Sequence, residues 1–157
     1  MITATLKEFL DAHGVRYVMI THSRTFTASE IAASAHVPGH ELAKTVIVWV
    51  EGRMAMVVLR ATTHIDIELL RDAIGIDDVH IAEEGDFRSR FPGCELGAMP
   101  PFGNLYGMDV FVDEGLISQE MIAFNAGTHV ELVKLAVDDF VKLVEPKVVR
   151  IAAHAVV

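Results

Sequence analysis

The sequence predicts an α+β fold, a single domain over residues 1–157 with a mixed central β-sheet surrounded by helices. Apolar runs of strand length alternate along the chain with segments whose apolar residues recur at helical spacing. A length of 157 residues suits one domain that buries its core without disulfides, and 52% hydrophobic residues argue against disorder. Because no repeat, low-complexity stretch or linker divides the chain, we expect one folding unit.

The first half of the chain combines helix caps with a clear hairpin pattern. Thr3 or Thr5 can cap a helix whose apolar residues stand at helical spacing and which ends at Gly14. Two apolar runs separated only by Glu51-Gly52 predict a β-hairpin with a tight turn. The expected elements are a helix over residues 3–14, a strand over 15–20, a helix from the capping box 27–30 to about residue 35, and strands over 44–50 and 53–59.

The second half mixes short strands with helices. Helical spacing of apolar residues stops at Gly75, and Pro92 ends a more polar helix. The stretch 93–104 that follows is irregular. The other expected elements are a helix over 66–74, a short strand over 79–82, the polar helix over 83–90, strands near 106–112, 120–125 and 129–134, a helix over 137–143, and a β-rich tail.

Composition and charge exclude several classes of function. A net charge of −9 disfavours broad binding to a nucleic-acid backbone, but it permits a small local site for the end of a nucleic acid. Cys94 is the single cysteine and cannot form an intramolecular disulfide. No apolar run reaches the roughly 18 residues of a membrane span, and the acid-containing N-terminus is unlike a signal peptide. We therefore expect a cytoplasmic protein with no membrane partner.

Familiar motifs for metal binding and covalent catalysis do not fit this chain. Lys44 stands where a zinc-protease helix needs its second histidine. Pro38, between His36 and His40, prevents the helix that would place both imidazoles on one face. No serine has the Gly-x-Ser-x-Gly context, and nothing in the sequence indicates a lowered pKa for Cys94. We expect no metal, no cofactor and no covalent nucleophile.

The stretch Gly97-Ala98-Met99-Pro100-Pro101-Phe102-Gly103 is the most informative segment of the sequence. Its prolines fix φ and remove two backbone donors, and its glycines permit dihedrals that other residues avoid. Two apolar side chains, Met99 and Phe102, lie inside this stiff segment rather than in a periodic element. Two interpretations fit these residues, a tight structural turn and the wall of a binding site.

Three polar side chains stand at expected strand ends, where they can converge on one pocket. Lys44 opens the most apolar strand, His22 closes the first strand, and His129 begins another strand after a glycine turn. Each has an ordinary alternative, because a lysine at a strand end is usually solvated and a lone histidine is more often structural. As a site residue, Lys44 would offer a fixed ammonium group to an anion or a carbonyl oxygen.

Taken in order along the chain, these motifs resemble the YbaK/prolyl-tRNA synthetase editing-domain family. The resemblance covers about residues 6–144 and rests on His22 with the capping box, Ala43-Lys44-Thr45, the stretch 97–103 and Ala126-Gly127-Thr128-His129. Members of this family are single α+β domains, either free-standing or inserted into a prolyl-tRNA synthetase, and several hydrolyse the ester of a mischarged aminoacyl-tRNA. Because no synthetase core surrounds the motifs, the resemblance implies the free-standing type, which acts in trans.

The resemblance implies a role for each matched residue. Lys44 is expected near the terminal adenosine and its phosphate, and Gly97 and Pro101 bound the Gly-x-x-x-Pro loop that lines the aminoacyl pocket. His129 holds a position that is aspartate in some relatives, and it is the best candidate for a general base. The expected catalytic residues are Lys44, Gly97, Pro101 and His129, and the expected substrate-binding residues are His22, Ala98, Met99, Pro100, Phe102, Gly127 and Thr128.

The expected function is hydrolysis, in trans, of the ester bond of mischarged aminoacyl-tRNA, a step of translation quality control. An aminoacyl ester is already activated, so a positioned water, a polarised carbonyl and the substrate's own ribose hydroxyl can be enough. The wall 97–102 would select a small amino acid by size, within the roughly 1–3 kcal/mol that a methylene is worth. The expected partners are the tRNA acceptor end carrying a wrong amino acid and an aminoacyl-tRNA synthetase.

Two other functions are compatible with the sequence. A non-catalytic module that binds an aminoacyl or nucleotide ligand for a synthetase would agree with the acidic charge and the lack of a strong base. A hydrolase of another small activated ester or amide would cleave free aminoacyl esters but not aminoacyl-tRNA. The sequence leaves the amino acid, the tRNA and the oligomeric state open.

Overall fold

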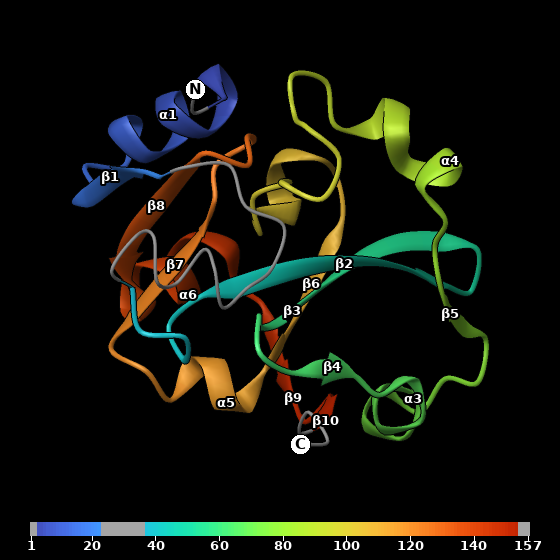
Figure 1. Ribbon diagram of the computed structural model, residues 1–157. Coiled ribbons are helices and arrows are strands. Elements are labelled where there is room, and N and C mark those ends of the chain that lie inside the picture. The colour runs from blue at the N-terminus through green and yellow to red at the C-terminus, as the bar shows by residue number, and fades with distance from the viewer. Residues whose placement is uncertain (1–2, 23–36, 154–157) are drawn as a thin grey trace.

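The chain begins with a capped amphipathic helix. The structure, a computed structural model, describes residues 3–22 and 37–153 (Figure 1). Helix α1 (Ala4–Ala12) starts at the expected position, because the Thr3 hydroxyl accepts the Leu6 backbone N–H at 3.3 Å. Leu6 and Leu10 lie one helical turn apart and are fully buried. The helix expected after the capping box 27–30 lies outside the described residues.

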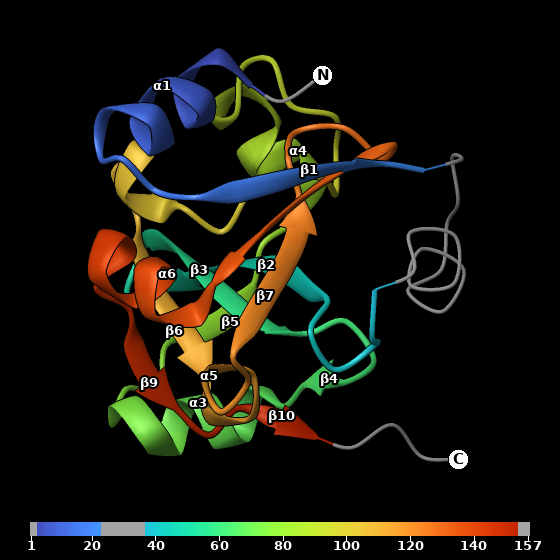
Figure 2. The same cartoon turned by 90° about the vertical axis from the view of Figure 1, so that its left-hand side faces the viewer.

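One layer of the protein is a three-stranded antiparallel sheet. Figure 2 shows this sheet facing the viewer, with the hairpin strands β2 and β3 behind it. Thr21 at the end of the first strand pairs with Glu131 at the start of its neighbour, so the register brings those two ends together. The strands, in spatial order, are β1 (Tyr17–Thr21), β8 (Glu131–Ala136) and β7 (Met121–Asn125).

The other layer is a five-stranded mixed sheet built on the expected hairpin. Glu51 and Gly52 have φ values of 49° and 77°, as a two-residue type I′ turn requires. Strand β6 runs parallel to both of its neighbours, β3 and β9, while the other pairs are antiparallel. The strands, in spatial order, are β5 (Val79–Ile81), β2 (Ala43–Val50), β3 (Arg53–Arg60), β6 (Asp109–Asp113) and β9 (Lys147–Val149).

The remaining elements are short and cover the sheets. Asp66 caps α3 (Ile67–Ile74) by accepting the N–H groups of Glu68 and Leu69, and Gly75 ends this helix with a φ of 69°. These elements are α3 (Ile67–Ile74), α4 (Glu84–Phe87), α5 (Glu114–Ile117), α6 (Val137–Val144), the 3₁₀ turns Arg88–Arg90 and Gly103–Leu105, and the strand pair β4 (His64–Ile65) and β10 (Ala152–Ala153).

The five-stranded sheet buries both of its faces. One face packs with α1, α6 and the three-stranded sheet in a large cluster that includes Leu10, Met56 and Phe140. The opposite face packs against α3, where Leu70 contacts a cluster that includes Val57. The structure therefore confirms the predicted α+β fold with a mixed sheet enclosed by helices.

Three expected boundaries are wrong, each for a local reason. The helix expected over 83–90 is broken into α4 and a 3₁₀ turn, in a segment that contains the poor helix former Gly85 and stops before Pro92. The strand expected over 106–112 starts only at Asp109, because Gly107 has a φ of 68°. His129 lies in a turn, and its strand begins at Glu131. The expected β-rich tail contains β9 and β10, and the structure also contains α5 and β4, which are too short for a periodic signal.

None of the helices in residues 3–22 and 37–153 has the length and apolar character needed to cross a membrane.

Candidate functional site

The stretch 97–103 is a turn with an exposed beginning and a buried end. Gly97 is exposed and has a φ of 82°, which favours glycine. At the other end Gly103 lies so close to the backbone of Met108 that an added Cβ would be 2.6 Å from its carbonyl oxygen. Gly103 also accepts the Met108 backbone N–H at 2.9 Å. The turn is therefore held rigidly where it joins the core, and it presents its backbone at Gly97.

Most side chains of this turn belong to the core. The Phe102 ring is fully buried and lies within 6.1 Å, between centroids, of the rings of Phe9, Phe124 and Phe140. Ala98 is also fully buried, and Met99 is 5% exposed. Pro100 and Pro101 are buried as well. The side chains of this stretch therefore form a structural turn, while its backbone is exposed at Gly97.

The turn 126–129 is bound directly to the stretch 97–103. The Gly127 N–H donates to the Ala98 carbonyl at 2.9 Å, and the Glu95 N–H donates to the Gly127 carbonyl at 2.8 Å. Gly127 has a φ of 100°, and an added Cβ would lie 2.5 Å from Cγ2 of Thr3. Backbone hydrogen bonds thus join two segments that lie about thirty residues apart in the sequence, and the close approach packs the turn against Thr3.

His129 lies against the exposed end of the stretch. Its Cε1 atom would be 3.4 Å from a Cβ built on Gly97. Its Nε2 atom is 2.6 Å from the Leu96 carbonyl oxygen, which can only accept, so Nε2 carries a proton. In the neutral ring the lone pair is then on Nδ1, and that nitrogen is the one able to accept a proton. The side chain is 27% exposed, which leaves it accessible from solvent.

His22 and Thr128 lie beside this pair of segments. The His22 backbone N–H donates to the Val130 carbonyl at 2.8 Å, which continues the pairing of β1 with β8 to the edge of the turn. The His22 residue is buried, with 6% exposed. Thr128 accepts the Val130 N–H at 3.4 Å through its hydroxyl oxygen. The structure therefore brings His22 to the same turn as His129.

Lys44 occupies a neighbouring strand. An isolated parallel bridge joins Leu42 to Ala123 of β7, so from that point β2 and β7 run in the same direction, β7 toward the turn 126–129. Lys44 is half-buried, and this burial lowers the pKa of its ammonium group because the charged form loses solvation. Within the described part of the chain the Lys44 ammonium group has no ion pair or hydrogen bond, and so none to His129 or the stretch 97–103.

Cys94 has the properties of a structural thiol. Burial raises the pKa of the thiol, against a smaller lowering by its contact with Tyr106, whose hydroxyl lies 3.7 Å from Sγ. Burial also raises the pKa of Tyr106, and Cys94 adds to that effect. A thiol held protonated is a poor nucleophile. Among residues 3–22 and 37–153, no group of three histidine, cysteine, aspartate or glutamate side chains is arranged to hold a metal ion.

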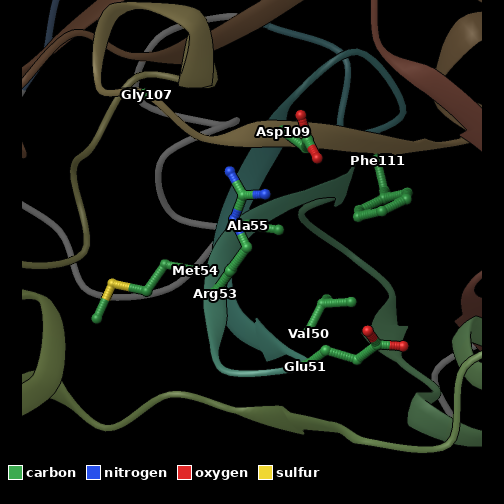
Figure 3. Close-up of a pocket in the computed structure, with 8 residues that line it drawn as sticks. All are labelled: Val50, Glu51, Arg53, Met54, Ala55, Gly107, Asp109 and Phe111. Atoms are coloured by element: carbon green, nitrogen blue, oxygen red, sulfur yellow. The ribbon is translucent and has the colours of Figure 1, made fainter.

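Two cavities differ in their relation to these residues. A cavity of about 220 Å³ at the β2–β3 hairpin, where the Arg53 side chain extends toward Asp109, contains none of the expected site residues (Figure 3). A larger cavity of about 480 Å³ borders the turn 126–129 through Thr128, and Glu95 also lines it. Its lining residues are Thr3, Ala4, Thr5, Pro92, Gly93, Glu95 and Thr128.

Glu95 is a residue of this region that the sequence did not single out. Its Oε2 atom accepts the His129 backbone N–H at 3.1 Å and lies 4.0 Å from Nε2 of the same residue. Its position two residues before Gly97 was the available signal, but a lone glutamate in an irregular stretch carries no periodicity or spacing that distinguishes it.

Comparisons with known proteins bear on the family and the fold of the chain. The family model described as "aminoacyl-tRNA editing domain" matches residues 22–143. No curated protein matches the chain in sequence. Among solved structures, the hypothetical protein APE2540 is similar with a TM-score of 0.83 and 22% identity, over 95% of this chain and 99% of that one.

Two further structures share the fold. A protein described as a candidate trans-editing enzyme for prolyl-tRNA synthetase has a TM-score of 0.81 and 17% identity, over 98% of this chain and 99% of that one. A protein of Marinobacter aquaeolei VT8, described as a candidate signal transduction protein, has a TM-score of 0.78 and 15% identity, over 98% of this chain but 31% of its own. At these identities the likeness establishes the fold. The match over residues 22–143 goes further and confirms the resemblance found in the sequence: the chain belongs to the aminoacyl-tRNA editing domain family.

Proposed function

We propose that this protein hydrolyses, in trans, the ester bond of tRNA mischarged with a small amino acid. The observation that carries the proposal is the junction of the stretch 97–103 with the turn 126–129. There an exposed glycine backbone and the histidine ring lie side by side, with the Gly127 N–H bonded to the Ala98 carbonyl at 2.9 Å. Membership of the aminoacyl-tRNA editing domain family supplies the substrate class.

The proposed chemistry needs little from side chains. The exposed backbone at Gly97 and the buried end at Pro101 bound a rigid wall against which the aminoacyl ester is held. His129 accepts a proton from the attacking water at Nδ1, the nitrogen that the Leu96 contact leaves with a lone pair. The substrate's ribose hydroxyl assists the same step. These steps need no side-chain nucleophile, which agrees with the Cys94 thiol, a poor nucleophile because burial raises its pKa.

We propose that Lys44 binds the terminal nucleotide of the tRNA and takes no part in the proton transfer. Its ammonium group has no carboxylate partner within the described residues, so its charge is available to a phosphate. The synthetase that produces the mischarged tRNA is the proposed protein partner. Ala98, Met99, Pro100 and Phe102 are proposed to set the size of the pocket through the backbone that they anchor, since their side chains are buried.

The experiment is a deacylation assay with purified protein and a panel of tRNAs mischarged with small amino acids. We expect at least one ester to be cleaved well above the rate in buffer, and Lys44→Ala to lower kcat/KM about 100-fold. Lys142→Ala is the matched control, because this lysine is exposed on α6, and it should leave the rate unchanged. If no ester is cleaved faster than in buffer, the proposed function is wrong.

Two companion measurements separate the alternatives. Calorimetry with a non-hydrolysable aminoacyl-adenosine analogue that shows tight binding, beside an inactive deacylation assay, would identify a binding module. Cleavage of free aminoacyl esters without cleavage of aminoacyl-tRNA would identify a hydrolase of another activated ester. Cleavage of aminoacyl-tRNA excludes both alternatives as the principal function.

A further inference from the structure

Glu95 joins the two segments of the candidate site with both its backbone and its side chain. Its backbone N–H donates to the Gly127 carbonyl at 2.8 Å, and its carbonyl accepts the Ala98 N–H at 3.1 Å. Its carboxylate oxygen Oε2 accepts the His129 backbone N–H at 3.1 Å. One residue therefore links the start of the stretch 97–103 to the turn that carries the imidazole.

The geometry around His129 depends on this link. The ring must stay within reach of the Leu96 carbonyl, 2.6 Å from Nε2, for the proton to remain on that nitrogen. The hydrogen bond from Glu95 fixes the backbone of His129, from which the ring projects. The same carboxylate oxygen lies 4.0 Å from Nε2 of the ring.

We propose that Glu95 is the positioning residue of His129, holding the turn so that Nε2 donates to Leu96 and Nδ1 faces the attacking water. This inference rests on the proposed function and adds to it a residue that acts through the imidazole. The carboxylate has a side chain that is 37% exposed and borders the cavity at Thr128, so it occupies the solvent side of the turn.

The reaction balances with these groups alone. The water oxygen forms a bond to the ester carbonyl carbon while one of its protons passes to Nδ1 of His129. The bond between the carbonyl carbon and the ribose oxygen then breaks, and the leaving ribose oxygen takes the proton from Nδ1. The products are the free amino acid and tRNA with an intact terminal hydroxyl, and the imidazole returns to its neutral form.

A double-mutant cycle tests whether Glu95 acts through His129. We expect Glu95→Ala to lower kcat about 10- to 100-fold with KM changed less than about 3-fold, because only the base is displaced. In a protein that already carries His129→Gln, the same substitution should lower kcat by less than about 3-fold. Glu95→Gln, which keeps an acceptor oxygen, should restore most of the activity. Equal losses in the two backgrounds would overturn the proposal.

A second measurement does not depend on activity. In ¹⁵N-labelled protein, the ring nitrogens of His129, assigned by their loss in His129→Gln, should report the tautomer with the proton on Nε2. Glu95→Ala should convert this signal to a mixture of tautomers, and Glu95→Gln should preserve it. A ring protonated on Nδ1 in the unmodified protein, or a signal that Glu95→Ala leaves unchanged, would overturn the proposal even if the esterase activity is confirmed.

The two arms also separate this inference from the proposed function. An unmodified protein that cleaves no ester contradicts the proposed function, and with it the catalytic use of His129, while the NMR arm still decides whether Glu95 positions the ring. If Glu95→Ala fails to fold, Glu95→Asp takes its place, because the shorter side chain keeps the charge and loses the reach to the His129 N–H. Thermal unfolding of each variant identifies which of them are folded.

Discussion

At the scale of single residues, the partly buried charge of Lys44 lowers the free energy of unfolding. Burial lowers the pKa of its ammonium group below the ordinary value of 10.5, because the charged form is desolvated. Over the alkaline range between that lowered pKa and 10.5, the unfolded chain binds more protons than the folded one, so the free energy of unfolding rises with pH. At neutral pH both states are charged, and the full cost of burying the charge is present.

We therefore predict that Lys44→Met stabilises the protein while it lowers kcat/KM for ester hydrolysis about 100-fold, as Lys44→Ala does. The methionine retains the apolar stem without the buried charge, and we expect about 0.5–1 kcal/mol in urea unfolding at neutral pH. The gain should shrink as the pH approaches 10.5. Lys142→Met, at an exposed position of α6, serves as the control and should change neither stability nor activity. A destabilised Lys44→Met protein would contradict the interpretation.

Two glycines allow the free-energy cost of a positive φ to be measured separately from the cost of steric crowding. Gly127 and Gly93 both have positive φ, 100° and 81°, but only an alanine at Gly127 would meet Thr3, at 2.5 Å. We predict that Gly93→Ala costs about 1 kcal/mol, the penalty of a left-handed residue, and that Gly127→Ala costs about 2–4 kcal/mol. Thr3→Ser removes the crowding methyl but keeps the hydroxyl that caps α1, so it should recover part of the loss. Equal costs at the two glycines would show that crowding is unimportant.

At the scale of elements, Asp113 fixes the end of β6 to the C-terminal segment. This carboxylate is 3% exposed, and its oxygens accept the backbone N–H groups of Gly115, Ile151 and Ala152, each at 3.0 Å. The capping of α5 and the position of β10 thus depend on one buried side chain. The sequence analysis did not single out Asp113, because its contacts with residues 151 and 152 span 38 and 39 positions.

We predict that Asp113→Ala lowers the free energy of unfolding by about 2–4 kcal/mol, since it leaves buried N–H groups without an acceptor. Asp113→Asn retains one acceptor oxygen and should cost less. Asp109→Ala is the control, because Asp109 is exposed on the same strand. Urea unfolding measures all three variants, and a loss at Asp113 no larger than at Asp109 would rule out the carboxylate as the link.

The elements that sequence predicted correctly are those with local signals. The cap at Thr3, the Glu51-Gly52 turn and the Asp66–Gly75 pair each fix an element from neighbouring residues alone. The helix expected over 83–90 fails because Gly85 weakens it. His129 appears in the sequence as a strand residue, but the hydrogen bonds of its turn to a segment thirty residues away delay the strand to Glu131.

At the scale of the whole molecule, the net charge of −9 bears directly on the proposed substrate. Because this charge disfavours broad binding to a nucleic-acid backbone, we expect the contacts with the proposed tRNA substrate to be few and local. Each phosphate of a single strand that a cation neutralises contributes about −0.7 to the slope of log affinity against log salt concentration.

We therefore predict a shallow salt dependence, with a slope of about −1 to −2, for binding of a tRNA minihelix that ends in an aminoacyl ester analogue. Fluorescence anisotropy measurements of binding at salt concentrations of about 50 to 200 mM would give this slope. The same protein with Lys44→Ala should lose about 0.7 from the magnitude of the slope. A slope steeper than about −5 would instead indicate an extended basic surface and would contradict the charge argument.

The sequence by itself determined the fold class, the hairpin, the stiff stretch 97–103 and the family, because each depends on residues close together in the chain or on the order of motifs along it. Only the tertiary structure decided how the site is assembled. It buries the ring of Phe102 in the core, brings His129 against Gly97, and bonds the His129 backbone N–H to the Glu95 carboxylate. Those contacts follow from strand pairing and backbone hydrogen bonds between distant segments, and such pairings leave no local pattern in a single sequence.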